Sequence, residues 1–163
     1  IEGFAFLPIT SFMMALTTFV SQNRGAKEYE RARKGARFGL VCSVSLAETI
    51  GLLIALFVTP LMRLFVDDPQ VIQYGVERAH YATILFFMLA YSHGVSAVLR
   101  GVGKSIIPMV VMLVCWCLVR VTLLTMLNML FHNILFVYLI YPFTWSLSSI
   151  VFFLYYRKIN WQE

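Results

Sequence analysis

Two ionisable side chains, Glu48 and Arg120, each stand alone near the middle of an apolar run about as long as a lipid bilayer is thick. A charged group at the bilayer centre costs about 2.5–3.5 kcal/mol, so such groups face a helix-bundle interior or a water-filled cavity. A carboxylate there can hold a cation or a proton, and a guanidinium can hold an anion or the carboxylate itself. We therefore predict that both face such an interior, with a Glu48–Arg120 pair as one arrangement. The structural alternative is a protonated Glu48 in a packed interface and an Arg120 that reaches headgroups or carbonyls.

A second polar group lies in the run from Ala79 to Leu99, where Tyr91, Ser92, His93, Gly94 and Ser96 follow one another closely. Polar side chains in lipid commonly join helices by hydrogen bonds, and less commonly line a cavity. Both interpretations stay open here. The candidates for an ion or substrate pathway are then Glu48, Arg120, Tyr91, His93, Ser96 and Glu2.

Enzymatic and metal chemistry find little support in the sequence. The stretch LRGVGKS ends like a phosphate-binding loop, but that loop needs a glycine where this chain has Val98. Cys42, Cys115 and Cys117 lie in apolar runs without the spacing of a metal site or a disulfide framework. Neither an HExxH motif nor a set of nucleophile, base and oxyanion residues is present. We predict no catalytic residue, no metal site and no cofactor, and hence no enzyme.

The composition identifies the solvent that these residues must face. The 163 residues are 60% hydrophobic and 13% charged, whereas soluble domains carry about 25% charged residues. The mean hydropathy of +0.80 means that the chain would expose apolar surface if it folded in water. Its net charge of +5 therefore indicates membrane orientation rather than nucleic-acid binding. We expect membrane lipid as a partner and no nucleic acid.

Five apolar segments are long enough to cross a bilayer as helices, which takes about 20 residues. They have the continuous apolar character of helices and lack the alternation of barrel strands. The predicted fold is an all-α polytopic membrane helix bundle with five transmembrane helices, at residues 3–21, 38–62, 79–99, 105–131 and 134–156.

The Lys and Arg residues between these spans gather on alternate connectors. The first and third connectors and the C-terminal tail hold ten of them: Arg24, Lys27, Arg31, Arg33, Lys34, Arg37, Arg100, Lys104, Arg157 and Lys158. The second connector holds only Arg63 and Arg78, and the fourth holds none. Because Lys and Arg are enriched in cytoplasmic loops, the first and third connectors and the C-terminus are predicted to be cytoplasmic. We expect a multi-pass protein of the cell membrane, specifically a bacterial inner membrane.

The first connector, residues 22–37, is the most basic part of the chain. Gly25 is expected to end the first helix in a left-handed conformation, after which AKEYERARKG favours a short helix at the membrane surface. Gly35 and Gly39 have the spacing that lets two helices approach closely. The connector either sets orientation alone or also couples two helices of a moving bundle. The residues assigned to this loop and to the tight third connector are Gln22, Gly25, Arg31, Arg33, Lys34, Arg100, Gly101 and Gly103.

The stretch FVSQNRGAKEYERARKG resembles the multidrug and toxic compound extrusion (MATE) family of membrane antiporters, in which a Q-x-x-G-A element ends a helix in each half of a twelve-helix protein. LRGVGKSIIPM is similar to that family's connector before a proline, and VCWCLVRV to the helix that follows it. With the ending YYRKINW, the resemblance covers essentially the whole chain. It implies that the five spans are the eighth to twelfth helices, which make up most of the C-terminal lobe.

The resemblance also implies a function and a missing part. The N-terminal lobe of the same polypeptide would be absent, in keeping with a chain that opens at Ile1 inside an apolar run. The family exports small organic, often cationic, substrates in exchange for sodium ions or protons, by alternating access between its lobes. Some members hold the cation on a carboxylate of the tenth helix, but residues 79–99 contain no Asp or Glu. Coupling would then rest on the other lobe, on Glu2 or on Glu48, and the driving ion stays open.

Other functions remain as alternatives. A lipid-linked oligosaccharide flippase of the same superfamily would be expected to have a larger, more cationic cavity than one central arginine provides. A membrane scaffold or complex subunit would use its intramembrane charges only to pair with partner helices.

Overall fold

The computed structural model describes residues 2–131 and 134–162, and every regular element within them is a helix. In chain order these are α1 (Glu2–Gly25), α2 (Tyr29–Arg63), α3 (Pro69–Thr83), α4 (Phe86–Gly101), α5 (Ile106–Met112), the π-helical η1 (Leu113–Val119), α6 (Arg120–Phe131) and α7 (Ile134–Arg157). The predicted all-α bundle is confirmed.

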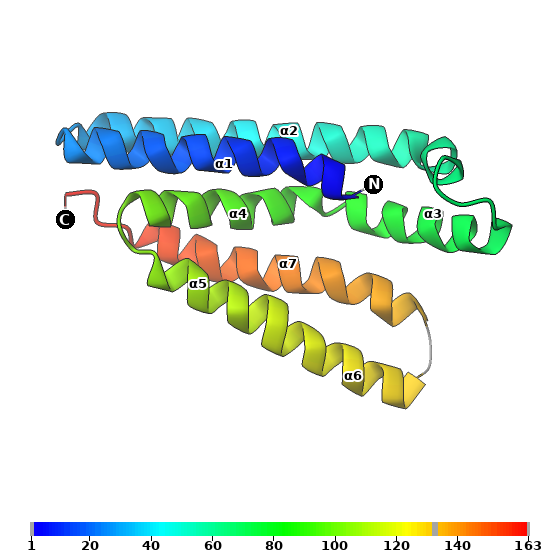
Figure 1. The fold of residues 1–163 in the computed structure, drawn as a ribbon. Coiled ribbons are helices and arrows are strands. Elements are labelled where there is room, and N and C mark those ends of the chain that lie inside the picture. The colour runs from blue at the N-terminus through cyan, green and yellow to red at the C-terminus, as the bar shows by residue number, and fades with distance from the viewer. Residues whose placement is uncertain (1, 132–133, 163) are drawn as a thin grey trace.

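Helix α4 lies at the centre of the bundle. It packs against α1 and α2 on one side and against α7 on the other, and α7 in turn packs against the helix built from α5, η1 and α6 (Figure 1). Eleven of the 16 residues of α4 are buried. Many of them are Ala, Gly or Ser, whose small side chains let neighbouring backbones approach closely. The polar residues predicted in the third span therefore lie on the central helix of the molecule.

Helices α1 and α2 pack closely where two glycines of α2 face α1. A Cβ atom on Gly39 would lie 2.6 Å from Leu16 Cδ1, and one on Gly35 would overlap the Phe19 ring. The close approach predicted from the spacing of Gly35 and Gly39 is confirmed.

The predicted short surface helix in the first connector is wrong. Helix α2 runs without interruption through 35 residues, which is about 52 Å at 1.5 Å per residue, whereas the hydrocarbon core is about 30 Å thick. Only residues 26–28 between α1 and α2 are irregular. The residues after Tyr29 are mostly good helix formers and include no proline before the apolar run, and Gly35 costs only about 1 kcal/mol in a helix. One helix therefore continues from the basic segment into the bundle.

The predicted third span, 79–99, is broken. Its first residues belong to α3, and α3 and α4 meet at a bend of 56°. The β-branched Thr83 and Ile84 favour helix less than their neighbours. Phe86, which opens α4, is 2% exposed and packs edge-on against Trp145 at 6.0 Å. The bend therefore falls where this aromatic contact fixes the start of α4.

The outer surface of the bundle is apolar. Met14, Phe38 and Leu56 are 73%, 74% and 75% exposed, which suits contact with lipid or with another part of a membrane protein. Within the described residues, three helices are long and apolar enough to cross a membrane, or four if the bent α3–α4 pair is one span. Those three are α2, the continuous helix Ile106–Leu130 and α7. The division into five spans stays a prediction.

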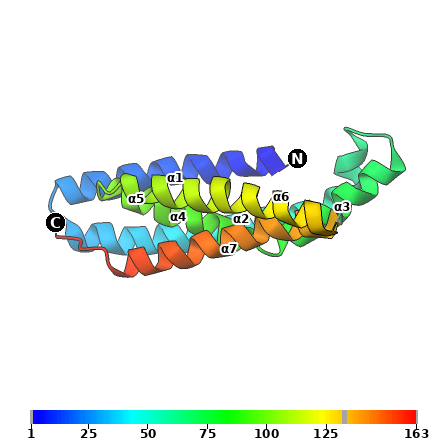
Figure 2. The ribbon, with the colours of Figure 1, turned by 90° about the horizontal axis from the view of Figure 1, so that it is seen from below.

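The basic connectors meet at one end of the bundle. The α1–α2 turn, the α4–α5 turn and the C-terminal tail lie together there, and the α2–α3 connection lies at the opposite end (Figures 1 and 2). We call the end with the two turns and the tail the basic end. The basic connectors, which alternate with less basic ones along the sequence, thus gather at one end of the bundle.

Candidate functional site

Arg120 lies inside the bundle and is held by two neighbouring elements. Its guanidinium donates hydrogen bonds from Nε (3.1 Å) and Nη2 (2.6 Å) to Thr144 Oγ1 of α7. The same group stacks over two rings, 5.0 Å from the centroid of Trp116 and 4.6 Å from that of Tyr141. The charge is therefore shared between a hydroxyl acceptor and two aromatic faces.

The π-helical segment η1 precedes Arg120 directly and carries Trp116. A π-helical turn contains an extra residue, so it changes which residues of the following helix face the bundle interior. Such turns are rare and are often found at functional sites. Here the segment ends where Arg120 and Trp116, four residues apart, both meet α7.

Trp116 lies between Arg120 and the polar residues of α7 and α4. Its Nε1 donates to Ser148 Oγ at 3.2 Å, and its ring meets His93 edge-on at 5.1 Å. The His93 ring also packs edge-on against Phe6 of α1, at 4.9 Å. A histidine between two aromatic rings is positioned by packing rather than by hydrogen bonds.

Serine hydroxyls join α4 to α7 beside this tryptophan. Ser92 Oγ lies 2.9 Å from Ser148 Oγ and 2.8 Å from Ser149 Oγ, and Ser149 donates to the Met88 carbonyl. For Ser92 the helix-joining interpretation is therefore confirmed. We call the connected residues the polar cluster: Ser92, His93, Trp116, Arg120, Tyr141, Thr144, Ser148 and Ser149.

Three of the predicted pathway residues keep hydrogen-bonding capacity. Glu48 Oε2, His93 Nε2 and Ser96 Oγ are buried with no hydrogen-bond partner in the described part of the chain. A buried polar atom without a partner costs about 1–3 kcal/mol, which a proton, ion, water or substrate group can offset. The polar cluster thus lies in an interior that still has unmatched acceptors.

The structure does not pair Glu48 with Arg120. The ion pair found among the described residues is instead Lys34–Glu30, at 2.8 Å on the exposed start of α2. Tyr91 is half-buried and packs against the hydrophobic core. The side chain of Glu2 lies outside the described residues.

At the basic end, α1 and α4 finish in the same way. Glu28 N donates to Asn23 O and Lys27 N to Arg24 O, while Lys104 N donates to Leu99 O and Gly103 N to Arg100 O. These are the two bonds of the Schellman motif, which needs a left-handed residue after the helix. That residue is Gly103 (φ 83°) in the third connector, whose predicted tight turn after Gly101 is confirmed.

In the first connector the left-handed residue is Lys27 (φ 62°) and not Gly25, so that prediction is wrong in detail. Helix α1 does end at Gly25, but the bonds from Lys27 and Glu28 continue the turn for two residues beyond it.

The two turns are also tied to one another. Arg24 Nη1 donates to the Val102 carbonyl, and Thr17 Oγ1 donates to the Ala97 carbonyl at 3.1 Å. Arg100 and the other predicted loop residues Gln22, Arg31, Arg33 and Lys34 are exposed. The first connector therefore holds α4 through Arg24, a residue that the loop assignment did not single out.

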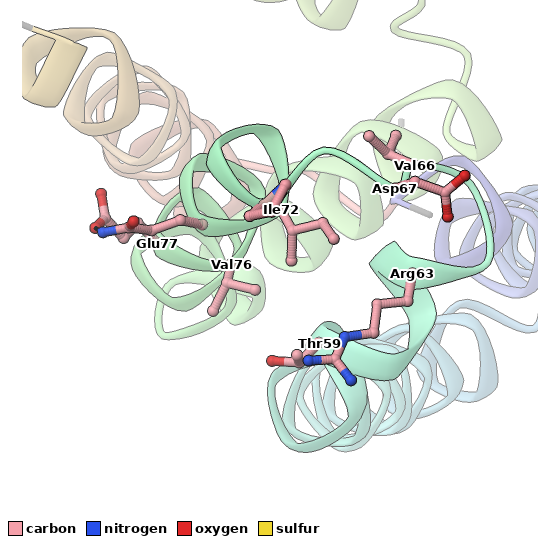
Figure 3. Close-up of a pocket in the computed structure, with 9 residues that line it drawn as sticks. Thr59, Arg63, Val66, Asp67, Ile72, Val76 and Glu77 are labelled. Carbon is pink, nitrogen blue, oxygen red and sulfur yellow. Dashed lines mark hydrogen bonds between the residues drawn. The ribbon is translucent and has the colours of Figure 1, made fainter.

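A separate cavity lies at the opposite end, and none of its lining residues belongs to the polar cluster. It has a volume of about 590 Å³ and lies between the end of α2 and the start of α3. In Figure 3, Thr59 and Arg63 of α2 are on one side and Ile72, Val76 and Glu77 of α3 on the other. Asp67 lies on the connection between them. This mixed-charge opening is distinct from the bundle interior.

The sequence prediction missed the α7 half of the polar cluster. Tyr141, Thr144, Ser148 and Ser149 recur at helical spacing along an otherwise apolar span, which places them on one face. That stripe was a usable signal. Trp116 was likewise not among the predicted site residues, although its position four residues before Arg120 places the two side chains on one face of the helix.

An apolar outer surface, helices long enough to span a bilayer and a buried polar interior define a polytopic helical membrane protein. The family model MatE matches residues 1–127. Over 111 residues the chain is 31% identical to the "Probable multidrug resistance protein NorM" of Thermotoga maritima, an alignment that takes in 68% of this chain and 24% of that protein. The chain belongs to the multidrug and toxic compound extrusion family, and its match corresponds to about a quarter of the relative's length.

Proposed function

We propose that these residues form most of the C-terminal lobe of a secondary active antiporter that exports organic, often cationic, compounds in exchange for sodium ions or protons. The match of residues 1–127 to the MatE family carries the proposal, and the relative named as a multidrug resistance protein supports the substrate class. In this proposal the lobe works with a second lobe, and the two alternate access to a cavity between them.

The polar cluster supplies chemistry suited to that task. The rings of Trp116 and Tyr141 already hold the Arg120 guanidinium, and aromatic faces hold other planar or quaternary cations by the same attraction. Glu48 has a buried carboxylate oxygen that finds no hydrogen-bond partner among the described residues. We propose it as a group that takes up the coupling ion, because binding a cation offsets the cost of its burial.

Transport by the full-length protein in proteoliposomes tests the proposal. A fluorescent organic cation is loaded, and its movement is followed while the sodium and proton gradients are collapsed in turn. We expect transport to stop with one of the two gradients. Glu48→Gln should lower the ion dependence, whereas Glu30→Gln, an exposed carboxylate on the same helix, should not. Transport that ignores both gradients would contradict the antiport mechanism.

A further inference from the structure

A basic pocket lies at the basic end, away from the polar cluster. It has a volume of about 330 Å³ and is formed where the start of α2 meets the end of α7 and the tail. Its lining residues are Arg33, Arg37, Tyr156, Arg157, Ile159 and Trp161. Three arginines therefore line one opening, and none of the described lining residues carries a carboxylate.

The acidic residue in the first turn of α2, Glu30, forms its ion pair with a lysine that does not line this pocket. Glu30 lies one turn before Lys34 and pairs with its Nζ at 2.8 Å. Within the described residues, no ion pair involves Arg33, Arg37 or Arg157. Converging guanidinium groups of this kind bind phosphate oxygens through paired N–H donors.

The aromatic residues place the pocket at the level of the membrane surface. Trp161 meets Tyr156 edge-on at 6.4 Å, and Trp and Tyr are enriched where the hydrocarbon core meets water. The pocket also lies where α2 and α7 pass from basic to apolar residues. It thus has the depth of a lipid headgroup.

Exposed apolar side chains continue from each wall of the pocket. On α2, Arg33, Arg37 and Val41 succeed one another at four-residue spacing, and Val41 is 66% exposed. On α7, the Arg157 guanidinium lies 5.7 Å over the Phe153 ring, and Phe153 and Ile150 are 47% and 59% exposed. An occupant with a phosphate in the pocket and a hydrocarbon chain along these faces would match both features.

We propose that the pocket of Arg33, Arg37 and Arg157 binds the phosphate headgroup of an anionic phospholipid, whose acyl chains lie along the exposed apolar faces of α2 and α7. A phospholipid places a phosphate among the three guanidinium groups and also covers the adjoining apolar surface, whereas free phosphate contacts only the guanidinium groups. The bound lipid would tie the first helix turns of α2 to the end of α7. This site depends on the membrane location of the bundle and not on transport.

Native mass spectrometry of the full-length protein in detergent tests the site. Phosphatidylglycerol, phosphatidylcholine and inorganic phosphate are added in separate titrations. We expect phosphatidylglycerol to bind and to be retained more strongly than phosphatidylcholine. The triple variant Arg33→Gln/Arg37→Gln/Arg157→Gln should weaken that binding by about a hundredfold, because each basic side chain near an anionic lipid is worth roughly fivefold in affinity.

A triple variant with the same charge change serves as the matched control. Arg31→Gln/Lys104→Gln/Lys158→Gln removes three charges from the basic end but none from the pocket, and it should leave phosphatidylglycerol binding within about twofold. If the pocket variant does not fold, Arg37→Gln alone should still weaken binding by about fivefold. Equal losses in both triples would assign binding to diffuse charge and overturn the site. Equal retention of the two lipids, or binding of inorganic phosphate in place of phosphatidylglycerol, would also overturn it.

Discussion

At the scale of single residues, the interior of this bundle is organised around one guanidinium. Arg120 has Thr144 as hydroxyl acceptor and the rings of Trp116 and Tyr141 on its faces. Arg78 lies over the same Tyr141 ring at 5.0 Å, so one aromatic ring receives two cations. This arrangement makes Tyr141 and Thr144 of α7 as important to the site as the arginine.

Thr144→Val should destabilise the protein, because it removes the acceptor of two Arg120 hydrogen bonds while the charge stays inside the bundle. We expect a loss of about 1–3 kcal/mol, measured as a lower Tm of the full-length protein in detergent. Thr125→Val is the control, since that hydroxyl is exposed and bonds only to the Val121 carbonyl of its own helix. Equal Tm values for the two variants would contradict the role given to Thr144.

At the scale of elements, the contact between α1 and α4 depends on one small residue near the basic end. A Cβ atom on Gly101 would lie 2.7 Å from Val20 Cβ and 2.9 Å from the Thr17 carbonyl oxygen. Val20 is completely buried, so neither neighbour has free space to move into. The two helices can approach this closely only because position 101 lacks a side chain.

Gly101→Ala should therefore separate α1 from α4 and lower stability by about 1–3 kcal/mol, the usual cost of overpacking. Gly25→Ala is the matched control, because nothing lies within 4 Å of a Cβ atom at that helix end. Thermal unfolding of both variants gives the comparison. A Gly101→Ala protein as stable as the Gly25→Ala protein would show that the helices are not in this contact.

At the scale of the whole molecule, the basic end is the feature from which we predict the orientation in the membrane. The turns after α1 and α4 and the C-terminal tail lie together (Figure 1). Ten of the 13 Lys and Arg residues lie in these segments or in the helix ends that adjoin them. Each added basic residue on that side favours its retention in the cytoplasm. We therefore predict that the whole basic end is cytoplasmic.

Cysteine accessibility checks this orientation in the full-length protein. With Cys42, Cys115 and Cys117 replaced by Ser, single cysteines at Glu30 and Gln162 should react with a membrane-impermeant maleimide only from the cytoplasmic side. A cysteine at Gln70, which begins α3 at the other end, should react only from outside. Labelling of positions 30 and 162 from opposite sides would contradict both the orientation and the bundle.

The sequence by itself determined that the chain lies in membrane lipid, that it is helical and which family it belongs to. These depend on composition, on the length of apolar runs and on local motifs such as Gly35-x-x-x-Gly39, all of which are readable along the chain. It also predicted that Arg120 faces an interior, because an isolated charge has few alternatives in lipid.

Only the tertiary structure decided which groups meet. Arg120 bonds to Thr144 and not to Glu48, and Ser92 of α4 lies against Ser148 of α7. The predicted third span bends before Phe86. Arg120 and Thr144 are 24 residues apart and Ser92 and Ser148 are 56 apart. Such contacts depend on how helices rotate and pack, since a rotation of about 100° per residue lets a small change in register select a different partner.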